Sequence, residues 1–116
     1  MSISALELLL HILDEVNFLL SKCPAIEKND FLKDETLKRA FSRSFEIIGE
    51  ASKNIPSAIK EQYVEVEWKS MARMRDKLIH RYFGVDYQLV WVTVLEDIPV
   101  LKVQIEKLID DLKSSR

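Results

Sequence analysis

Glycine and proline are rare in this chain: glycine occurs twice and proline three times among 116 residues. Antiparallel sandwiches and barrels need many short turns, and those turns are rich in glycine and proline. The chain therefore has too few turn-forming residues for a many-stranded β fold. Its hydrophobic fraction of 47% is typical of a globular protein and unlike that of a disordered one. We therefore expect an all-α fold.

Apolar residues recur at helical spacing in four long segments, which predicts four main helices. A short helical turn is expected over residues 57–63, between the second and third of them. Up-and-down packing of the four helices is the simplest arrangement, within one domain that covers residues 1–116. The four expected helices span about residues 4–22, 34–54, 68–83 and from 87 onward.

Several residues predict where these helices begin, end or bend. Asp34 and Asp86 stand where N-caps are expected, and Gly84 stands where a glycine ends the third helix. Pro99 should kink or divide the fourth helix. Gly49 lies inside the second helix, where glycine costs about 1 kcal/mol relative to alanine. We expect another backbone or a ligand to approach closely at Gly49.

The composition excludes several classes of protein. A single cysteine, Cys23, cannot form an intrachain disulfide, and two histidines with one cysteine cannot supply a zinc site of the usual spacing. We expect no metal and no cofactor. The apolar start of the chain is interrupted by Glu7, His11 and Asp14, which argues against a signal peptide or a membrane span. We therefore expect a cytoplasmic protein.

Two helices carry more apolar surface than one packing contact needs. The apolar stripe of the first helix is widened by Leu8, Ile12 and Leu19, which predicts contact on two sides and is compatible with a second subunit on one of them. The last helical segment has further apolar residues opposite its main stripe, which suggests self-association. These residues are Leu89, Val92, Val100 and Val103.

The segment from residue 68 to residue 83 carries a concentrated positive charge. Between residues 69 and 81 there are five basic residues and one acid, so the local charge is +4 in a chain of net charge −2. Such a patch suits a phosphate-bearing partner such as RNA, although it is also compatible with an ordinary solvated face. The candidate RNA-binding residues are Lys69, Arg73, Lys77 and Arg81.

Three residues of this segment are candidates for chemistry. On a helical wheel Arg75 falls in the middle of the apolar face, where an arginine needs a carboxylate or an anionic ligand. Asp76 and His80 are four residues apart and could touch on a helix. A histidine can exchange a proton with a ribose hydroxyl while an arginine stabilises the phosphate, and these groups suffice for RNA cleavage without a metal. On an ideal helix, however, Arg75 and His80 diverge by roughly 140°.

The sequence RDKLIHRY at residues 75–82 resembles the R-x4-H-x-Y motif of the HEPN superfamily, in particular of the HepT-like toxins. Two further stretches agree with this resemblance: FEIIGEA at residues 45–51 and VDYQLVW at residues 85–91. The resemblance covers most of the chain, from the first helix to about residue 101.

The resemblance implies a HEPN-like helical bundle that dimerises and places two motifs across a cleft. It implies a toxin that is a metal-independent endoribonuclease, cleaving a tRNA or an mRNA, with Arg75, Asp76 and His80 at the catalytic positions. It also implies a partner, a nucleotidyltransferase antitoxin of the MntA-like kind, which neutralises the toxin by adenylylating Tyr82.

The residues also have simpler interpretations. Arg75 alone is compatible with a structural ion pair, His80 with a solvated surface position and Tyr82 with a packing aromatic. Glu46 and Glu50 are candidates for orienting basic groups, on charge alone. The alternative function is a catalytically silent HEPN domain, one that binds nucleotide or RNA or serves only as partner and substrate of the nucleotidyltransferase.

Overall fold

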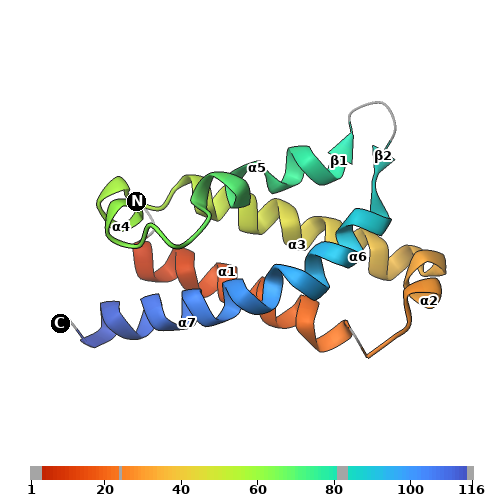
Figure 1. The fold of residues 1–116 in the computed structure, drawn as a ribbon, viewed down its shortest axis with the longest axis horizontal. Helices are drawn as coiled ribbons and strands as arrows, with labels where there is room; N and C mark the ends of the chain where they lie inside the picture. Colours follow the sequence, from red (N-terminus) through yellow and green to blue (C-terminus); the bar gives the residue numbers. More distant parts are fainter. Residues whose placement is uncertain (1–3, 24, 81–83, 115–116) are drawn as a thin grey trace.

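The computed structural model describes residues 4–23, 25–80 and 84–114, although the side chains of Arg75, Ile79 and His80 are outside the description. The described part is an elongated helical bundle with extents of 46 × 30 × 27 Å, which confirms the all-α prediction (Figure 1). The helices are α1 (Ala5–Lys22), α2 (Lys28–Lys33), α3 (Glu35–Lys53), α4 (Ser57–Gln62), α5 (Trp68–Leu78), α6 (Tyr87–Glu96) and α7 (Ile98–Ser114), and the strands are β1 (Ile79–His80) and β2 (Gly84–Val85).

Helix α1 packs against α3 on one side and against α7 on the other, and α3 in turn packs against α5. The wide apolar stripe of α1 is therefore used inside the chain. Leu8, Ile12 and Leu19, which widen that stripe, are all buried.

No helix within the described residues is both long and apolar enough to cross a membrane.

The N-caps predicted from sequence are present. The Asp34 side chain accepts a hydrogen bond from the Leu37 amide at 2.9 Å, and the Asp86 side chain accepts one from the Leu89 amide at 3.0 Å. The expected division of the last helical segment also occurs, because α6 ends at Glu96 and α7 begins at Ile98. Proline is tolerated in the first turn of a helix, where its missing N–H would have no intrahelical partner.

Helix α2 was not expected from the sequence. It is only six residues long, and a single buried residue, Phe31, anchors it. The Phe31 ring contacts three other aromatic rings, with centroid distances of 4.9 Å to Phe41, 5.3 Å to Trp91 and 6.4 Å to Tyr87. Tertiary packing therefore stabilises a helix that is too short to be stable by itself.

Gly49 marks the closest approach of α3 to α5. A Cβ atom at Gly49 would lie 3.3 Å from the Met71 carbonyl oxygen and 3.5 Å from the Ala72 carbonyl oxygen. Both atoms belong to the backbone of α5, so the expectation of a close approach at Gly49 is confirmed, with a backbone as the neighbour.

One sequence prediction of local structure is wrong. The third main helix was expected to continue to Phe83, but α5 ends at Leu78 and the chain enters a short antiparallel hairpin, in which Ile79 pairs with Val85 and His80 with Gly84. The Asp86 amide donates to the Leu78 carbonyl at 2.8 Å, which satisfies a carbonyl at the end of α5. Gly84 has a φ of 77°, so its left-handed backbone serves the hairpin rather than a helix end.

Candidate active site and basic groove

The end of α5 divides the motif at residues 75–82 into two parts. Arg75 and Asp76 belong to the last turn and a half of α5, whereas His80 belongs to β1. The divergence of 140° calculated for a continuous helix therefore does not apply. The helical contact between Asp76 and His80 also loses its basis, because the four-residue spacing brings side chains together only within a helix.

Not every candidate residue falls in the described part of the structure. The side chains of Arg75 and His80 lie outside the described residues, as do Arg81 and Tyr82 entirely. The roles assigned to these four residues remain predictions. The structure does describe Asp76 and three of the four candidate RNA-binding residues.

Asp76 lies where α5 faces α3. Its exposed side chain lines a depression of about 240 Å³ together with Glu46 and Glu50 from α3, the two acidic residues proposed to orient basic groups. Lys53 adds one positive charge to this depression. The Glu46 carboxylate pairs with the Arg43 guanidinium at 3.4 Å on the surface of α3. Such an arrangement of carboxylates is suited to holding a basic side chain.

The described residues contain no group of three or more His, Cys, Asp or Glu side chains placed to hold a metal ion. Although three carboxylates line the depression at Asp76, they do not form such a group.

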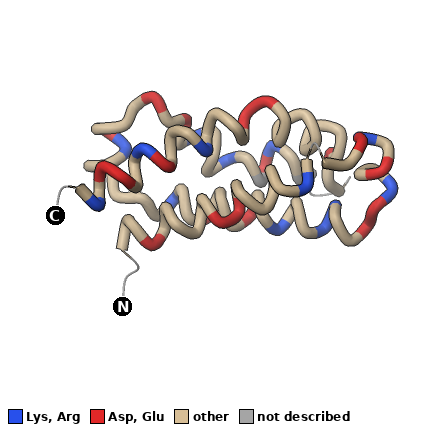
Figure 2. The backbone as a smooth tube through the Cα atoms, turned by 90° about the horizontal axis from the view of Figure 1, so that it is seen from below, with Lys and Arg blue, Asp and Glu red and all other residues tan. Residues whose placement is uncertain are grey.

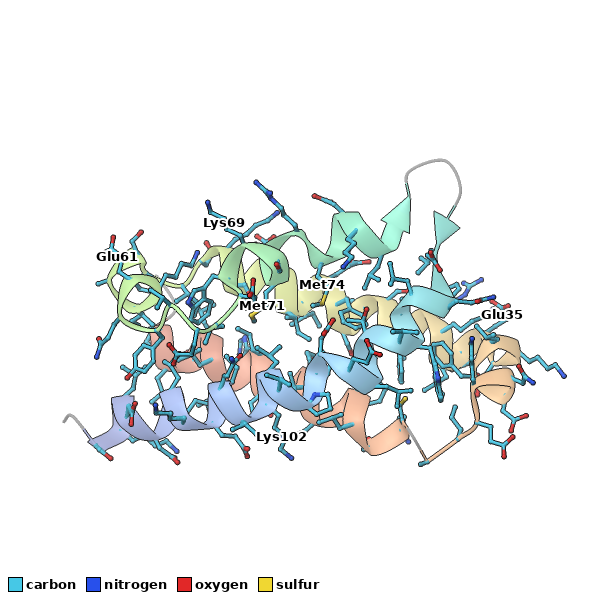
Figure 3. All side chains as sticks on the ribbon, viewed as in Figure 1. Glu35, Glu61, Lys69, Met71, Met74 and Lys102 are labelled. Atoms are coloured by element: carbon cyan, nitrogen blue, oxygen red, sulfur yellow. The ribbon has the colours of Figure 1, made fainter. Side chains whose placement is uncertain are left out.

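The opposite side of α5 carries a row of cations, which we call the basic row: Lys69, Arg73 and Lys77. All three side chains are exposed, and none forms an ion pair with another described residue. Lysines and arginines occur together with acidic residues along most of the molecule, so this row is a local feature (Figure 2). Lys69 projects outward from α5, whereas Met71 and Met74 point toward the interior (Figure 3).

The basic row lowers the stability of the helix that carries it. Like charges four residues apart on a helix repel each other. Lys69 also lies in the first turn of α5, which contains no acidic residue, and a cation there opposes the helix dipole. An arrangement that is unfavourable in the free protein is favourable when an anion binds, so the basic row is a candidate phosphate-binding surface.

The basic row lines a groove between α5 and the junction of α6 with α7. Its volume is about 330 Å³, and its other wall contains Thr93 and Asp97. Sequence analysis missed these wall residues, which lie about twenty positions from the basic row along the chain. The position of Asp97 directly before a helix is the only signal in the sequence, and that signal predicts a cap rather than a groove.

Three groups with a shifted pKa contribute to packing and to helix ends. The phenol of Tyr63 donates to an Asp111 carboxylate oxygen at 2.9 Å, and this hydrogen bond raises the pKa of Tyr63. Burial raises the pKa of the Cys23 thiol, and the hydrogen bond from Lys38 lowers the pKa of Glu35. None of these three residues lines the groove at the basic row or the depression at Asp76.

Comparison with known proteins identifies relatives over most of the chain. A family model described as ribonuclease HepT-like matches residues 11–108. A protein of Caldanaerobacter subterraneus subsp. tengcongensis, provisionally named an RNase, is 50% identical over 103 residues, which cover 89% of this chain and 92% of the relative. A protein of Thermococcus cleftensis, provisionally named ribonuclease HepT, is 60% identical over 79 residues, which cover 68% and 72% of the two chains.

A third relative, from Methanocaldococcus jannaschii and also provisionally named an RNase, is 42% identical over 102 residues, covering 88% of this chain and 84% of its own length. No solved structure matches the chain significantly.

Proposed function

Because the chain belongs to the HepT-like ribonuclease family of the HEPN superfamily, we propose that it is an endoribonuclease that cleaves RNA through the motif at residues 75–82. The family match supports ribonuclease activity in general. The observation that carries the proposal for this chain is the basic row on α5, three exposed cations that form no ion pair with the other described residues and lie along the helix that carries the start of the motif. Phosphate contacts of this kind supply most of the affinity of a protein for a nucleic acid.

In the proposed reaction His80 takes a proton from a ribose 2′-hydroxyl. The 2′-oxygen attacks the adjacent phosphorus, the bond from phosphorus to the 5′-oxygen breaks, and that oxygen takes a proton from water, while His80 later returns to solvent the proton that it took. The products are a 2′,3′-cyclic phosphate and a free 5′-hydroxyl. Arg75 holds the phosphate and stabilises its developing negative charge. Asp76 orients His80 through charge.

We further propose that the active enzyme is a homodimer. Four apolar side chains of α6 and α7 are exposed: Val92 by 39%, Leu95 by 41%, Val100 by 57% and Val103 by 68%. A second copy of the chain is the occupant that the family resemblance implies for this face. Sedimentation velocity should show a dimer that Val103→Asp weakens, whereas Val64→Asp, at a 77% exposed position outside the helices, should leave it intact. A monomeric wild-type protein would contradict this proposal.

The proposed regulation is that of a toxin and its antitoxin. The Tyr82 hydroxyl attacks the α-phosphate of ATP, pyrophosphate leaves, and the enzyme gains an adenylyl group that blocks the site. The expected catalyst is a nucleotidyltransferase antitoxin of the MntA-like kind. After co-expression with such an enzyme, intact mass should rise by one adenylyl group in the wild type and not in Tyr82→Phe. A mass increase that persists in Tyr82→Phe would show that another residue is modified.

The decisive experiment is cleavage of a tRNA or mRNA pool in EDTA by unmodified wild-type protein and by His80→Ala. We expect cleavage by the wild type and a loss of about 10²–10⁴-fold in the variant, because general acid–base catalysis contributes about that factor. Equal cleavage by both proteins would place the chemistry elsewhere. Cleavage by neither, with an intact mass that excludes a blocked Tyr82, would favour the catalytically silent binding domain.

A further inference from the structure

The groove at the basic row continues into a second depression along α7. The two depressions have volumes of about 330 and 450 Å³ and share four lining residues. Volumes of this size are typical of sites that bind small molecules or parts of larger ligands, about 300–1,000 Å³. The shared residues are Ser70, Met74, Lys77 and Asp97.

The two rims of this groove carry opposite charges. The basic row forms the rim on α5, and Asp97 forms the rim at the junction of α6 with α7. Yet within the described residues the Asp97 carboxylate makes no ion pair with Lys69, Arg73 or Lys77. An anion and a row of cations thus face one groove without neutralising each other.

Asp97 also differs from the other two aspartates that precede helices. The side chains of Asp34 and Asp86 each accept a capping hydrogen bond from a backbone amide. The hydrogen bonds of Asp97 to described residues involve its backbone only: its amide donates to Thr93 O at 2.9 Å, and its carbonyl accepts from Leu101 N at 3.0 Å. The exposed carboxylate oxygens therefore have unused capacity to accept hydrogen bonds.

The Asp97 carboxylate interacts differently with the phosphate and with the base of a nucleotide. It repels a phosphate, which the basic row attracts, and it accepts hydrogen bonds from an exocyclic amino group. Cytosine, adenine and guanine each present such an amino group on their pairing edge, whereas uracil presents two carbonyl oxygens beside a single N–H. The floor of the groove, formed by the buried Met74 and Leu78, offers an apolar surface to the face of a base.

We infer that this groove binds one unpaired nucleotide of the RNA strand, with its phosphate on the basic row and the amino group of its base on Asp97. Asp97 is then a residue that determines base preference. The groove extends to Leu78, two positions before His80, so the bound nucleotide lies beside the motif. This inference rests on the proposed function, because it takes RNA as the ligand.

The test measures base preference in the absence of cleavage. Fluorescence anisotropy at one fixed salt concentration compares eight-nucleotide oligo(C), oligo(A) and oligo(U) on full-length protein carrying His80→Ala. We expect oligo(C) and oligo(A) to bind about tenfold more tightly than oligo(U), within the range reported for specific base contacts. Adding Asp97→Asn should reduce that ratio to below about threefold, because the amide offers one acceptor and an N–H₂ donor.

Glu96→Gln is the matched control. Glu96 is exposed, neighbours Asp97 and does not line the groove, so its substitution removes the same charge. Both substitutions remove one negative charge and should raise the affinity for oligo(U) by a similar factor, but only Asp97→Asn should lower the preference for oligo(C) and oligo(A) over oligo(U). Asp97→Ser provides a second variant should the amide perturb folding, which circular dichroism monitors.

An unchanged ratio after adding Asp97→Asn or Asp97→Ser would overturn the inference, and so would a ratio near one or an absence of binding in the protein that carries His80→Ala alone. These results leave the proposed function separately testable, because cleavage by the wild type and its loss in His80→Ala do not depend on base preference. Cleavage with an unchanged ratio would refute only the role of Asp97.

Discussion

The two sides of α5 illustrate two different uses of one helix. On the side of α3, the backbones approach so closely that a Cβ atom at Gly49 would lie 3.3 Å from a carbonyl oxygen. On the opposite side, three exposed cations line an open groove that reaches the junction of α6 and α7. The first side contributes stability through close packing, whereas like-charge repulsion on the second lowers stability and leaves a candidate surface for an anion. Stability and function are therefore separable by substitution on this one helix.

The largest expected effect comes from adding a side chain at Gly49, on the side of α5 that packs against α3. Gly49→Val places a branched side chain against the α5 backbone, which cannot move as a flexible side chain would. We expect the free energy of unfolding to fall by about 3 kcal/mol, the upper range for overpacking. Urea denaturation measures it, and Arg39→Val, at an exposed position of the same helix, reports the cost of valine propensity alone. Equal losses in both variants would contradict the close approach.

Substitutions in the basic row should weaken RNA binding without lowering the stability of the fold. Replacing Lys69, Arg73 and Lys77 by Gln should weaken single-stranded RNA binding about thirtyfold, roughly 2 kcal/mol, and reduce the salt slope by about 2, since each phosphate contact contributes about 0.7. The free energy of unfolding should stay the same or rise slightly, because like-charge repulsion is removed. The matched control replaces three lysines of α7, Lys102, Lys107 and Lys113, by Gln. If both triple variants bind RNA equally, the basic row is not the binding surface.

The smallest effect on stability is expected in the hairpin, where a substitution at Gly84 changes only the energy of the backbone conformation. No atom of the other described residues lies within 4 Å of a Cβ built on Gly84, but the φ of Gly84 is 77°. Gly84→Ala should therefore lower the free energy of unfolding by about 1 kcal/mol, the cost of a left-handed backbone for an L-residue. Gly84→Asn should lower it less, since asparagine tolerates this region better. Thermal denaturation compares the two, and a neutral Gly84→Ala would argue against the positive φ.

The sequence predicts helices well where local signals and periodicity agree. Asp34 and Asp86 cap the helices that they were expected to cap, and the helix end near Asn54, just before Pro56, and the division near Pro99 follow from the chemistry of proline. Helix α2 was missed because its stability comes from the contacts of Phe31 with distant rings. The end of α5 was misplaced because the apolar periodicity continues past Leu78. In the structure the helix ends there, because the next residues pair with β2 as a strand.

The candidate site shows the same division. The basic row and the motif residues could be found from the sequence, because they lie within one short segment. The opposite wall of the groove could not, because Thr93 and Asp97 come from another helix and approach α5 only in the folded chain. Charge alone made Glu46 and Glu50 candidates for orienting basic groups but did not place them near Asp76. The packing of α3 on α5 brings these three residues to one depression.

The all-α class, the helix caps, the close approach at Gly49 and the charge of α5 were predictable from the sequence, because each depends on residues near one another along the chain. Three features became visible only in the folded chain: α3 and α7 cover the wide stripe of α1, the motif is divided between a helix and a strand, and Asp97 lies across the groove from the basic row. These features depend on which distant surfaces meet, and neither periodicity nor spacing along the chain specifies that.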